Sequence, residues 1–491
     1  MSRVLFIIRP MCLVLAFSVA AFASSTAETI GISAEAVAKG NAVVSTVHDW
    51  SSAFYNTAGL GRAHYGKKGA AEGTKTMALI KKTEEGGSAA KEEKDYYPNE
   101  ISLGVMYTHP LFEVDFASGS NVNMDPTEDL ESPVLMVGLA IDLNLLYKLP
   151  EKIFSSARLG VAAALNADFS VAEINDVDLR SHNFLRYGHE ARKLSAFVGA
   201  GLGFMKDMFG LGLGLNASFS GEGKVNLDNV KVQGSPQVPE GQAKMNLDLS
   251  PYAVCGFYFD FGKAVSVLEG LSLGACYRQE SYLEIDPFPT ITSIQHGNIM
   301  MLLQLAIFDY YSPHNVSAGI SYSRWGVTLE FDMEYQMWSM YKVSSKVEDV
   351  FENQVKVGLP DYDDILIYKI GISYDALSWL SVMVGYMYQP TFVPDEAVND
   401  TVFNMMDNDK HIASVGASFT VGKYFGMQGP IKLTIAYQFQ YLVPRTVDKN
   451  QTKIEASLAD YSYENYDPTL NPGYSYGGTA HTILFGMTFM L

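Results

Sequence analysis

Alternation of apolar and polar residues runs from residue 100 to the end of the chain, and it constrains the fold more than any other feature. In residues 326–341, for example, Phe331 stands between Glu330 and Asp332. Successive side chains of a β-strand point to opposite faces, so such a segment has one apolar and one polar face. This pattern suits a transmembrane β-barrel, whose strands face lipid on one side and the lumen on the other.

Fourteen segments carry the pattern, an even number, as closed single-chain barrels of bacterial outer membranes require. They are 100–110, 132–147, 156–169, 192–206, 209–221, 245–261, 269–283, 298–322, 326–341, 365–376, 379–390, 411–423, 430–443 and 480–491. Strands of globular proteins average about 5–6 residues. The greater length of these segments favours an all-β transmembrane barrel of about fourteen strands over a soluble sandwich.

The connections between the segments alternate in length. Those near 111–131, 170–191, 222–244, 284–297, 342–364, 391–410 and 444–479 are long, and the others are mostly short. Outer-membrane barrels have long loops outside and short turns in the periplasm, so both ends of this barrel are expected on the periplasmic side. The last segment ends in an apolar row closing on Leu491, resembling the terminal strand that outer-membrane assembly machinery recognises.

The first residues predict a secretory signal peptide. An apolar run follows Arg3, and the small-x-small triplet Ala21-Phe22-Ala23 supplies a cleavage site. We therefore expect residues 1–23 to be removed and the chain to reach the outer membrane of a Gram-negative bacterium. Cys255 and Cys276 remain, and the alternation argues against a disulfide because it places them on opposite faces of neighbouring strands.

Composition separates a barrel from other kinds of membrane protein. Aromatic residues make up 12% of the chain, yet the mean hydropathy is only +0.04, and a helical membrane protein would be far more hydrophobic. After the signal peptide no uncharged apolar stretch reaches the roughly 18 residues that a spanning helix needs. The net charge of −19 argues against nucleic acid as a partner. We expect a monomer surrounded by outer-membrane lipids.

Residues 40–62 precede the alternation without sharing it, and they mix small residues, turn formers and a few aromatics. We interpret residues 24–66 as a hatch that plugs the lumen, with Asn56, Thr57 and Ala58 at its functional centre. Residues 67–98, rich in Lys, Glu and Gly, are interpreted as a flexible polar insertion, with a basic docking site as the alternative. The barrel then takes residues 99–491.

Four short motifs are spread across nearly the whole mature chain. They are Ala38-Lys39-Gly40-Asn41-Ala42 with Ala53-Phe54-Tyr55-Asn56-Thr57-Ala58-Gly59-Leu60; Gly274-Ala275-Cys276-Tyr277-Arg278; Glu334-Tyr335-Gln336-Met337-Trp338-Ser339; and Gly385-Tyr386 with Pro390 to Asp395. Together they resemble the FadL/TodX-type family of outer-membrane transport proteins, and the first looks like the family's hatch with its Asn-Pro-Ala motif. The resemblance implies a passive channel for hydrophobic compounds, above all long-chain fatty acids.

This chain departs from the family pattern in two places. Thr57 stands where the family usually has proline, so the fixed φ of a proline ring is lost there. The insertion at 67–94 lengthens the path from the hatch to the first strand. Both departures affect how the hatch is attached and gated, and neither argues against the barrel fold.

Side chains alternate between the two faces of a strand, and this alternation (strand parity) predicts two rows of glycines on the lumen face. The rows are Gly199, Gly201 and Gly203 on one strand and Gly210, Gly212 and Gly214 on the next. Six residues without side chains leave a trough in the wall. Because glycine in a strand often marks close backbone approach, we expect the hatch to pack there, with a passage for an acyl chain as the alternative.

The same parity turns seven charged residues inward, namely Asp142, Arg158, Arg278, Glu330, Asp332, Glu334 and Lys369. An isolated charge buried in a narrow lumen is costly, so these charges must be paired or solvated. We predict that Arg158, Glu330, Asp332 and Glu334 take part in an ion-pair network that holds the hatch. Arg278 or Lys369 is the candidate to receive a ligand carboxylate, because Arg suits two-point contact.

No cofactor and no metal site is predicted, since the nine histidines are scattered without metal-ligand spacing. The predicted function is passive uptake of hydrophobic compounds, without catalytic activity. Two alternatives stay open. A general polar-solute porin would need an open lumen with steady ion conductance. A barrel enzyme such as a lipase or protease would show turnover that one Ser or His substitution abolishes.

Overall fold

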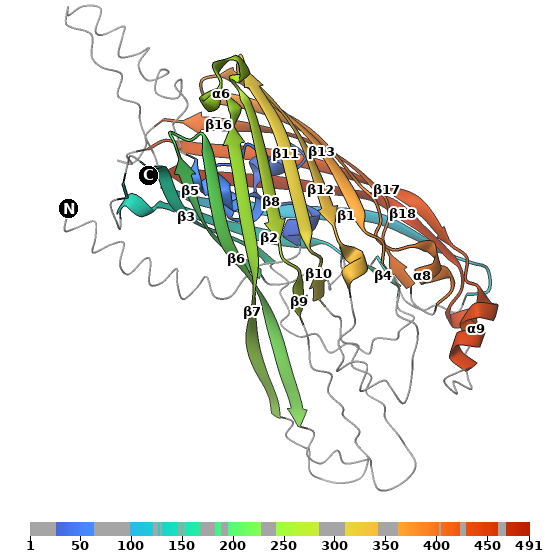
Figure 1. Cartoon of the computed structure of the whole chain (residues 1–491). Coiled ribbons are helices and arrows are strands. Elements are labelled where there is room, and N and C mark those ends of the chain that lie inside the picture. The colour runs from blue at the N-terminus through green and yellow to red at the C-terminus, as the bar shows by residue number, and fades with distance from the viewer. Residues whose placement is uncertain are drawn as a thin grey trace, which may run out of the picture.

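The protein, described here as a computed structural model, forms one closed antiparallel β-barrel of fourteen strands (Figure 1). The structure describes residues 26–62, 99–120, 126–127, 130–145, 149–150, 153–166, 182–187, 195–226, 242–283, 310–341, 362–401, 404–422, 429–459 and 468–491. The predicted signal peptide and the insertion at 67–94 lie outside these residues. No helix within them is long and apolar enough to cross a membrane.

The barrel strands are β1 (Glu100–Phe116), β2 (Ser132–Asp142), β3 (Phe154–Asn166), β5 (Ser195–Phe204), β6 (Phe209–Asn226), β7 (Gln242–Asp260), β8 (Leu271–Arg278), β11 (Asn315–Arg324), β12 (Val327–Gln336), β13 (Ile365–Leu377), β14 (Leu380–Gln389), β16 (Lys410–Val421), β17 (Ile431–Val447) and β18 (Tyr474–Met490). Each pairs with its neighbours, and β1 closes the barrel by pairing with both β2 and β18. Each of the fourteen predicted segments overlaps one of these strands, so the predicted fold class is confirmed.

Some strand ends differ from the prediction. β1 continues past Pro110 to Phe116. Its pairing with β2 stops at Thr108, so beyond that residue β1 pairs only with β18. A proline is tolerated in a strand that is paired on one side only, because its missing N–H is then not needed. The predicted segment 269–283 is divided, since the chain leaves the barrel after Arg278. The short strand β9 (Ser281–Leu283) then pairs with β10 (Tyr310–Ser312) in a separate two-stranded sheet.

The two faces of the strands are as predicted. In β12, Leu329 is 47% exposed on the outer face, whereas Asp332 is 1% exposed on the lumen face. Cys255 is exposed, Cys276 is buried, and both are free thiols. The barrel surface thus has the apolar exterior that lipid requires and a polar interior.

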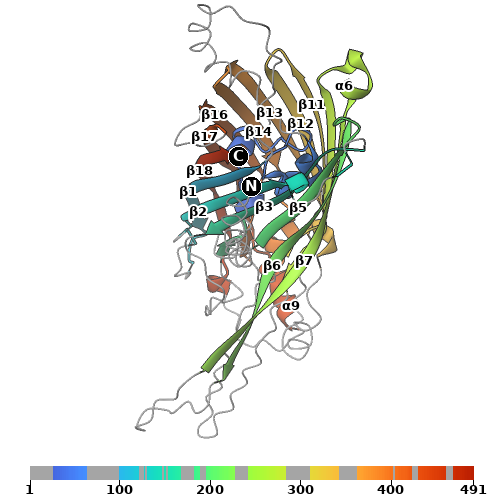
Figure 2. The same ribbon diagram turned by 90° about the vertical axis from the view of Figure 1, so that its left-hand side faces the viewer.

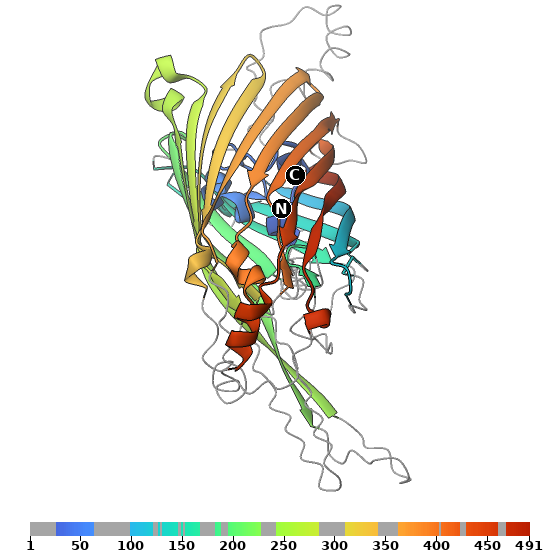
Figure 3. The same ribbon diagram turned by 90° about the vertical axis from the view of Figure 1, so that its right-hand side faces the viewer.

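The two ends of the barrel differ as expected. The β11–β12 turn consists of Trp325 and Gly326, both with positive φ, as tight hairpin turns require. The same end holds both ends of the barrel, where the Leu491 N–H donates to the Asn99 carbonyl at 2.8 Å. At the opposite end β6 and β7 run on past the other strands as a hairpin (Figures 2 and 3).

Short elements occupy the lumen and the connections. The N-terminal segment, residues 26–62, lies inside the barrel (blue in Figure 1) and contains α2 (Thr26–Thr29), α3 (Ala34–Ala38), α4 (Ser52–Tyr55) and η2 (Thr57–Gly61). The connections hold η3 (Leu143–Leu145), β4 (His182–Phe184), α6 (Phe261–Ala264), η5 (Ser266–Leu268), η6 (Trp338–Met340), α8 (Asp395–Asn399), β15 (Asn404–Met406), α9 (Gln451–Ala459) and η7 (Pro468–Leu470). Parallel pairing joins β4 to β15.

Candidate functional site

The backbone of the N-terminal segment packs directly on Gly201, Gly203 and Gly212 of the two glycine rows of β5 and β6. A Cβ atom built on Gly212 would lie 2.2 Å from the backbone nitrogen of Ala58, and one on Gly201 would lie 2.4 Å from that of Gly61. Real side chains cannot make such contacts, so these positions admit only glycine. The backbone of η2 therefore fills the trough that the glycines leave in the wall.

Asn56 ties this packing together. Its Nδ2 donates to the carbonyl oxygen of Val44 at 2.7 Å and to that of Phe257, in the wall, at 3.0 Å. Its Oδ1 accepts from the Ala58 N–H at 3.1 Å, which caps the start of η2. Asn56 thus joins two turns of the segment to strand β7.

Thr57 is the first residue of η2, a position where proline is well tolerated because the N–H there has no partner within the helix. Within the described residues, the buried Thr57 Oγ1 makes no hydrogen bond. The Thr57 methyl group packs on Gly199 and Gly214. The turn is held by the Asn56 cap, and the threonine hydroxyl adds nothing to it.

Arg158 of β3 holds the end of the segment. Its guanidinium donates to the carbonyl oxygens of Leu60 at 2.9 Å, Arg62 at 3.0 Å and Gly59 at 3.4 Å, and also to that of His48. The side chain is fully buried. The sequence predicts carboxylate partners for Arg158, whereas its partners here are backbone carbonyls, because strand parity gives the face of a residue and not the group opposite it.

Glu330 and Asp332 of β12 hold the middle of the segment. Asp332 Oδ2 accepts from the N–H groups of Val43 at 2.7 Å and Val44 at 2.9 Å, and Glu330 Oε1 accepts from the Ser45 N–H at 2.7 Å. Three successive N–H groups pointing at carboxylates form an anion-binding nest. The sequence predicts cations as partners of these carboxylates. Their partners here are backbone N–H groups and, for Glu330, also the hydroxyls of Ser45 and Thr46.

A partly open cavity of about 180 Å³ lies between the N-terminal segment and the long-loop end of the barrel. Its apolar lining includes Phe54, Leu185, Trp338, Tyr362, Ile367, Met387 and Phe392, and its charged lining is Glu28, Arg186, Arg278, Glu334 and Lys369. The cavity thus joins a mainly apolar surface to a few charged groups, the usual character of a small-molecule site.

Arg278 and Lys369, the two residues expected to meet a ligand carboxylate, both line this cavity. The Arg278 Nη2 donates to the Phe54 carbonyl oxygen at 2.8 Å, and Nη1 lies 3.8 Å from Glu28 Oε1. Lys369 forms an ion pair with Glu334. Both cations therefore already have an acidic neighbour.

Aromatic rings from separate connections cover the outer part of the cavity. The rings of Trp338 and Phe392 stack with centroids 3.8 Å apart, and Tyr362 meets Phe392 edge-on at 5.1 Å. Arg186 lies over the Phe392 ring, 4.9 Å from its centroid. Trp338 and Phe392 belong to segments that carry the family resemblance. Arg186 lies in a predicted loop, where no periodicity marks it.

Glu35 connects α3 to the wall through an ion pair with Lys432 of β17. Burial alone would raise the pKa of Glu35, but the ammonium groups of Lys432 and Lys39 hold it well below its usual range. A carboxylate with a depressed folded-state pKa contributes stability above its unfolded pKa, about 4.3, and loses it as the pH falls further.

We therefore expect Glu35→Gln to reduce the acid sensitivity of the barrel. The unfolding temperature of the unchanged protein should fall as the pH drops below about 4.3, because protonation removes the Glu35–Lys432 attraction. Thermal scans across this range should show a smaller fall for Glu35→Gln. Glu396→Gln, at an exposed position of α8, is the matched control. Identical pH profiles for the two variants would contradict the assignment.

These features define a class by fold: a closed fourteen-stranded barrel whose own N-terminal segment lies in the lumen, a fold similar to that of FadL-type barrels. The crystal structure of a Pseudomonas aeruginosa FadL homologue matches with a TM-score of 0.50 at 12% identity, covering 96% of this chain and 98% of that chain. The Pseudomonas putida toluene transporter TodX is less similar, with a TM-score of 0.42 at 10% identity over 92% and 98% of the two chains.

Sequence comparison also finds a curated relative. Alkane uptake protein A of Marinobacter nauticus is 24% identical over 361 residues, which cover 70% of this chain and 75% of the relative. No family model matches the chain. The predicted resemblance to the FadL/TodX-type outer-membrane transport family is confirmed.

Proposed function

We propose that the chain is a passive outer-membrane channel for hydrophobic compounds, and that its ligands are long-chain fatty acids. The observation that carries this proposal is the cavity of about 180 Å³ that lies between the N-terminal segment and a pair of stacked aromatic rings. An apolar solute partitions poorly into a water-filled pore, so a lined pocket behind a movable hatch suits it better than an open channel.

The choice of a fatty acid over an alkane rests on the charged part of the lining. The relative named for alkane uptake supports an apolar ligand. An alkane makes no polar interaction with Arg278 and Lys369 on the cavity wall, whereas the carboxylate of a fatty acid accepts charge-assisted hydrogen bonds from such cations. We infer that the acyl chain lies on the rings and the head group faces the cations.

Release of ligand then requires the N-terminal segment to act as a hatch. We propose Asn56-Thr57-Ala58 as its gate, because Asn56 joins Val44, which lines the cavity, to Phe257 in the wall. Breaking these two hydrogen bonds would free the loop that carries Val44 from strand β7. We further propose that the protein works as a monomer in the outer membrane and needs no cofactor.

The proposal predicts uptake without ion leakage. Liposomes containing the purified protein should accumulate labelled palmitate faster than protein-free liposomes, while planar-bilayer recordings of the same preparation should stay near the baseline. The Asn56→Ala variant should raise conductance, because it removes the hydrogen bond to Val44 within the segment and the hydrogen bond to Phe257 in the wall.

Two outcomes would favour the alternative functions. High, steady conductance of the unchanged protein would defeat the plugged-barrel proposal and favour a polar-solute porin. Hydrolysis of a labelled ester or peptide by the purified barrel, abolished by one Ser or His substitution, would favour a barrel enzyme.

A further inference from the structure

Large apolar side chains are exposed at the turn end of the barrel, the end that holds the β11–β12 turn and that α6 marks in Figure 1. Five connections each contribute one: Ile153, Met205, Val267, Trp325 and Trp379, which we call the collar. Val267 is 89% exposed and Trp325 84%. The tips of turns that face water normally carry polar residues, so a ring of apolar ones needs an explanation.

Two members of the collar occupy costly backbone positions. Met205 and Trp325 have φ angles of 50° and 54°, in the left-handed region. Gly, Asn and Asp are favoured at such turn positions, because a bulky side chain is strained there. Both side chains stay exposed, so packing within the protein does not offset this cost. Strain that is kept at an exposed turn tip indicates a contact outside the chain.

The collar continues the lipid-facing surface of the barrel. On β12 the exposed row of Tyr335, Phe331 and Leu329 leads toward Trp325. Ten positions separate Tyr335 from Trp325. At about 3.3 Å per residue in a strand tilted by about 40°, they span about 25 Å along the barrel axis. The apolar band around outer-membrane barrels is about that tall, so the collar lies at the border of the band.

Basic side chains accompany the collar. Lys206 and Lys263 lie in its connections, and Arg324 ends β11, with its guanidinium carbon 4.7 Å from the centre of the Trp325 ring. All three cations are exposed. The β7–β8 and β11–β12 connections contain one acidic residue, Glu269, in a chain whose net charge is −19. An amphipathic ring beside a cation suits the head-group region of a phospholipid leaflet, where carbonyls and phosphates lie close together.

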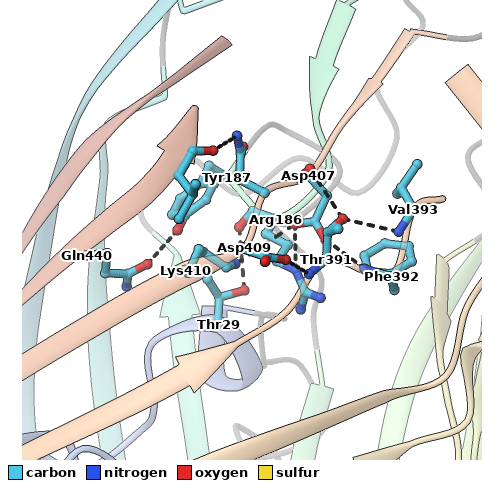
Figure 4. A network of polar contacts seen from close by, with 12 residues as sticks. Thr29, Arg186, Tyr187, Thr391, Phe392, Val393, Asp407, Asp409, Lys410 and Gln440 are labelled. Atoms are coloured by element: carbon cyan, nitrogen blue, oxygen red, sulfur yellow. Dashed lines mark hydrogen bonds and ion pairs between the residues drawn. The ribbon is translucent and has the colours of Figure 1, made fainter. Parts of the chain in front are cut away.

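The long-loop end of the barrel is built differently. There the polar groups are tied to one another, as Figure 4 shows for Thr391 between Asp407 and Asp409. The Thr391 N–H donates to Asp409 at 2.9 Å, and its hydroxyl donates to Asp407 at 3.1 Å. The two ends therefore suit different surroundings, water at the long-loop end and the membrane interface at the collar.

We propose that the collar lies among the head groups of the membrane leaflet at the turn end, and that Lys206, Lys263 and Arg324 bind phospholipid phosphates there. A partner protein in water would account for apolar turn tips, but not for their level at the border of the lipid-facing band. The inference rests on the proposed location in the outer membrane and not on the proposed ligand.

Fluorescence quenching in reconstituted vesicles tests the position of Trp325. Trp338→Phe/Trp379→Phe leaves two of the four tryptophans, Trp325 and the buried Trp50. Phosphatidylcholine brominated near the glycerol end of its acyl chains should lower the fluorescence of this variant by about a third or more. Adding Trp325→Phe should abolish that loss. Quenching by acrylamide but not by the brominated lipid would place Trp325 in water and overturn the proposal, and a water-soluble partner protein would then be the better occupant.

Phospholipid affinity tests the three cations without relying on tryptophan. Lys206→Gln/Lys263→Gln/Arg324→Gln in non-ionic detergent should bind phosphatidylglycerol about tenfold or more weakly than the unchanged protein, as measured by native mass spectrometry. Lys206→Arg/Lys263→Arg/Arg324→Lys should keep the affinity, and so should Lys453→Gln at an exposed position of α9. Equal affinities of the glutamine variant and the unchanged protein would overturn the phosphate contacts. Neither measurement uses the transported compound, so the collar and the proposed function fail or stand separately.

Discussion

Arg158→Met should detach the end of the N-terminal segment from the barrel wall. The substitution removes a donor from the carbonyl oxygens of His48, Gly59, Leu60 and Arg62, and the Gly59 oxygen keeps another donor, the Arg62 N–H at 3.0 Å. A buried acceptor left without a partner costs about 1–3 kcal/mol, and several together predict a loss of about 3–5 kcal/mol. We expect a lower unfolding temperature and a segment that leaves the wall more often.

Cys276 provides a direct measurement of that movement. Its thiol is buried in the lumen, whereas Cys255 is exposed on the outer face, so in a Cys255→Ser background a maleimide reports only on the lumen. Arg158→Met should speed the modification of Cys276. Arg324→Met, at an exposed position beside the β11–β12 turn, should not. A Cys276 that stays as unreactive as before, in a barrel of unchanged stability, would show that Arg158 does not hold the segment.

The attachment of the N-terminal segment follows a simple rule of charge. Carboxylates of the wall accept from N–H groups of the segment, as Asp332 does from Val43. Guanidinium groups of the wall donate to its carbonyls, as Arg278 does to Phe54. The segment contributes mainly backbone, which explains why small residues and turn formers suffice there. Charge-assisted hydrogen bonds of this kind are stronger than neutral ones, so a few of them hold a long segment.

The barrel is predictable from the sequence because its signal is local. Period-two alternation assigns each residue to a face without knowledge of its neighbours in space, so the inward position of Lys369 and the outward position of Phe331 both follow. The ends of strands are less predictable. Pro110 looks like a stop in isolation, and only the pairing of β1 with β18 shows that the strand continues.

The contacts of the candidate site are not predictable in the same way. Asp332 and Val43 are 289 positions apart, and nothing in either local pattern indicates that they meet. Arg186 lies in a long connection without periodicity, so alternation gives it no face at all. The glycine rows are the exception: their spacing alone predicts close approach of another backbone, which here is η2.

Gly212→Ala should displace the N-terminal segment through a single methyl group. The new Cβ would lie 2.2 Å from backbone atoms of Thr57 and Ala58, and a backbone cannot move aside as a flexible side chain can. Overpacking in a close-packed site costs about 1–3 kcal/mol, and contact with backbone places this change at the upper end of that range. The displaced segment should raise planar-bilayer conductance and speed maleimide modification of Cys276.

Gly486→Ala is the matched control, because it adds the same methyl group to the lumen face of β18 where room exists. Its Cβ would lie 3.5 Å from the Cβ of Ala34, an ordinary van der Waals contact. We expect Gly486→Ala to keep the low conductance and the slow thiol reaction of the unchanged protein. If neither alanine changes the conductance or the rate of Cys276 modification, the segment accommodates the methyl group at Gly212 without opening the lumen. Close packing on the glycine rows is then not what keeps the lumen closed. If both variants raise the conductance equally, the close contact at Gly212 is not the cause, because an added methyl group elsewhere on the inner wall has the same effect.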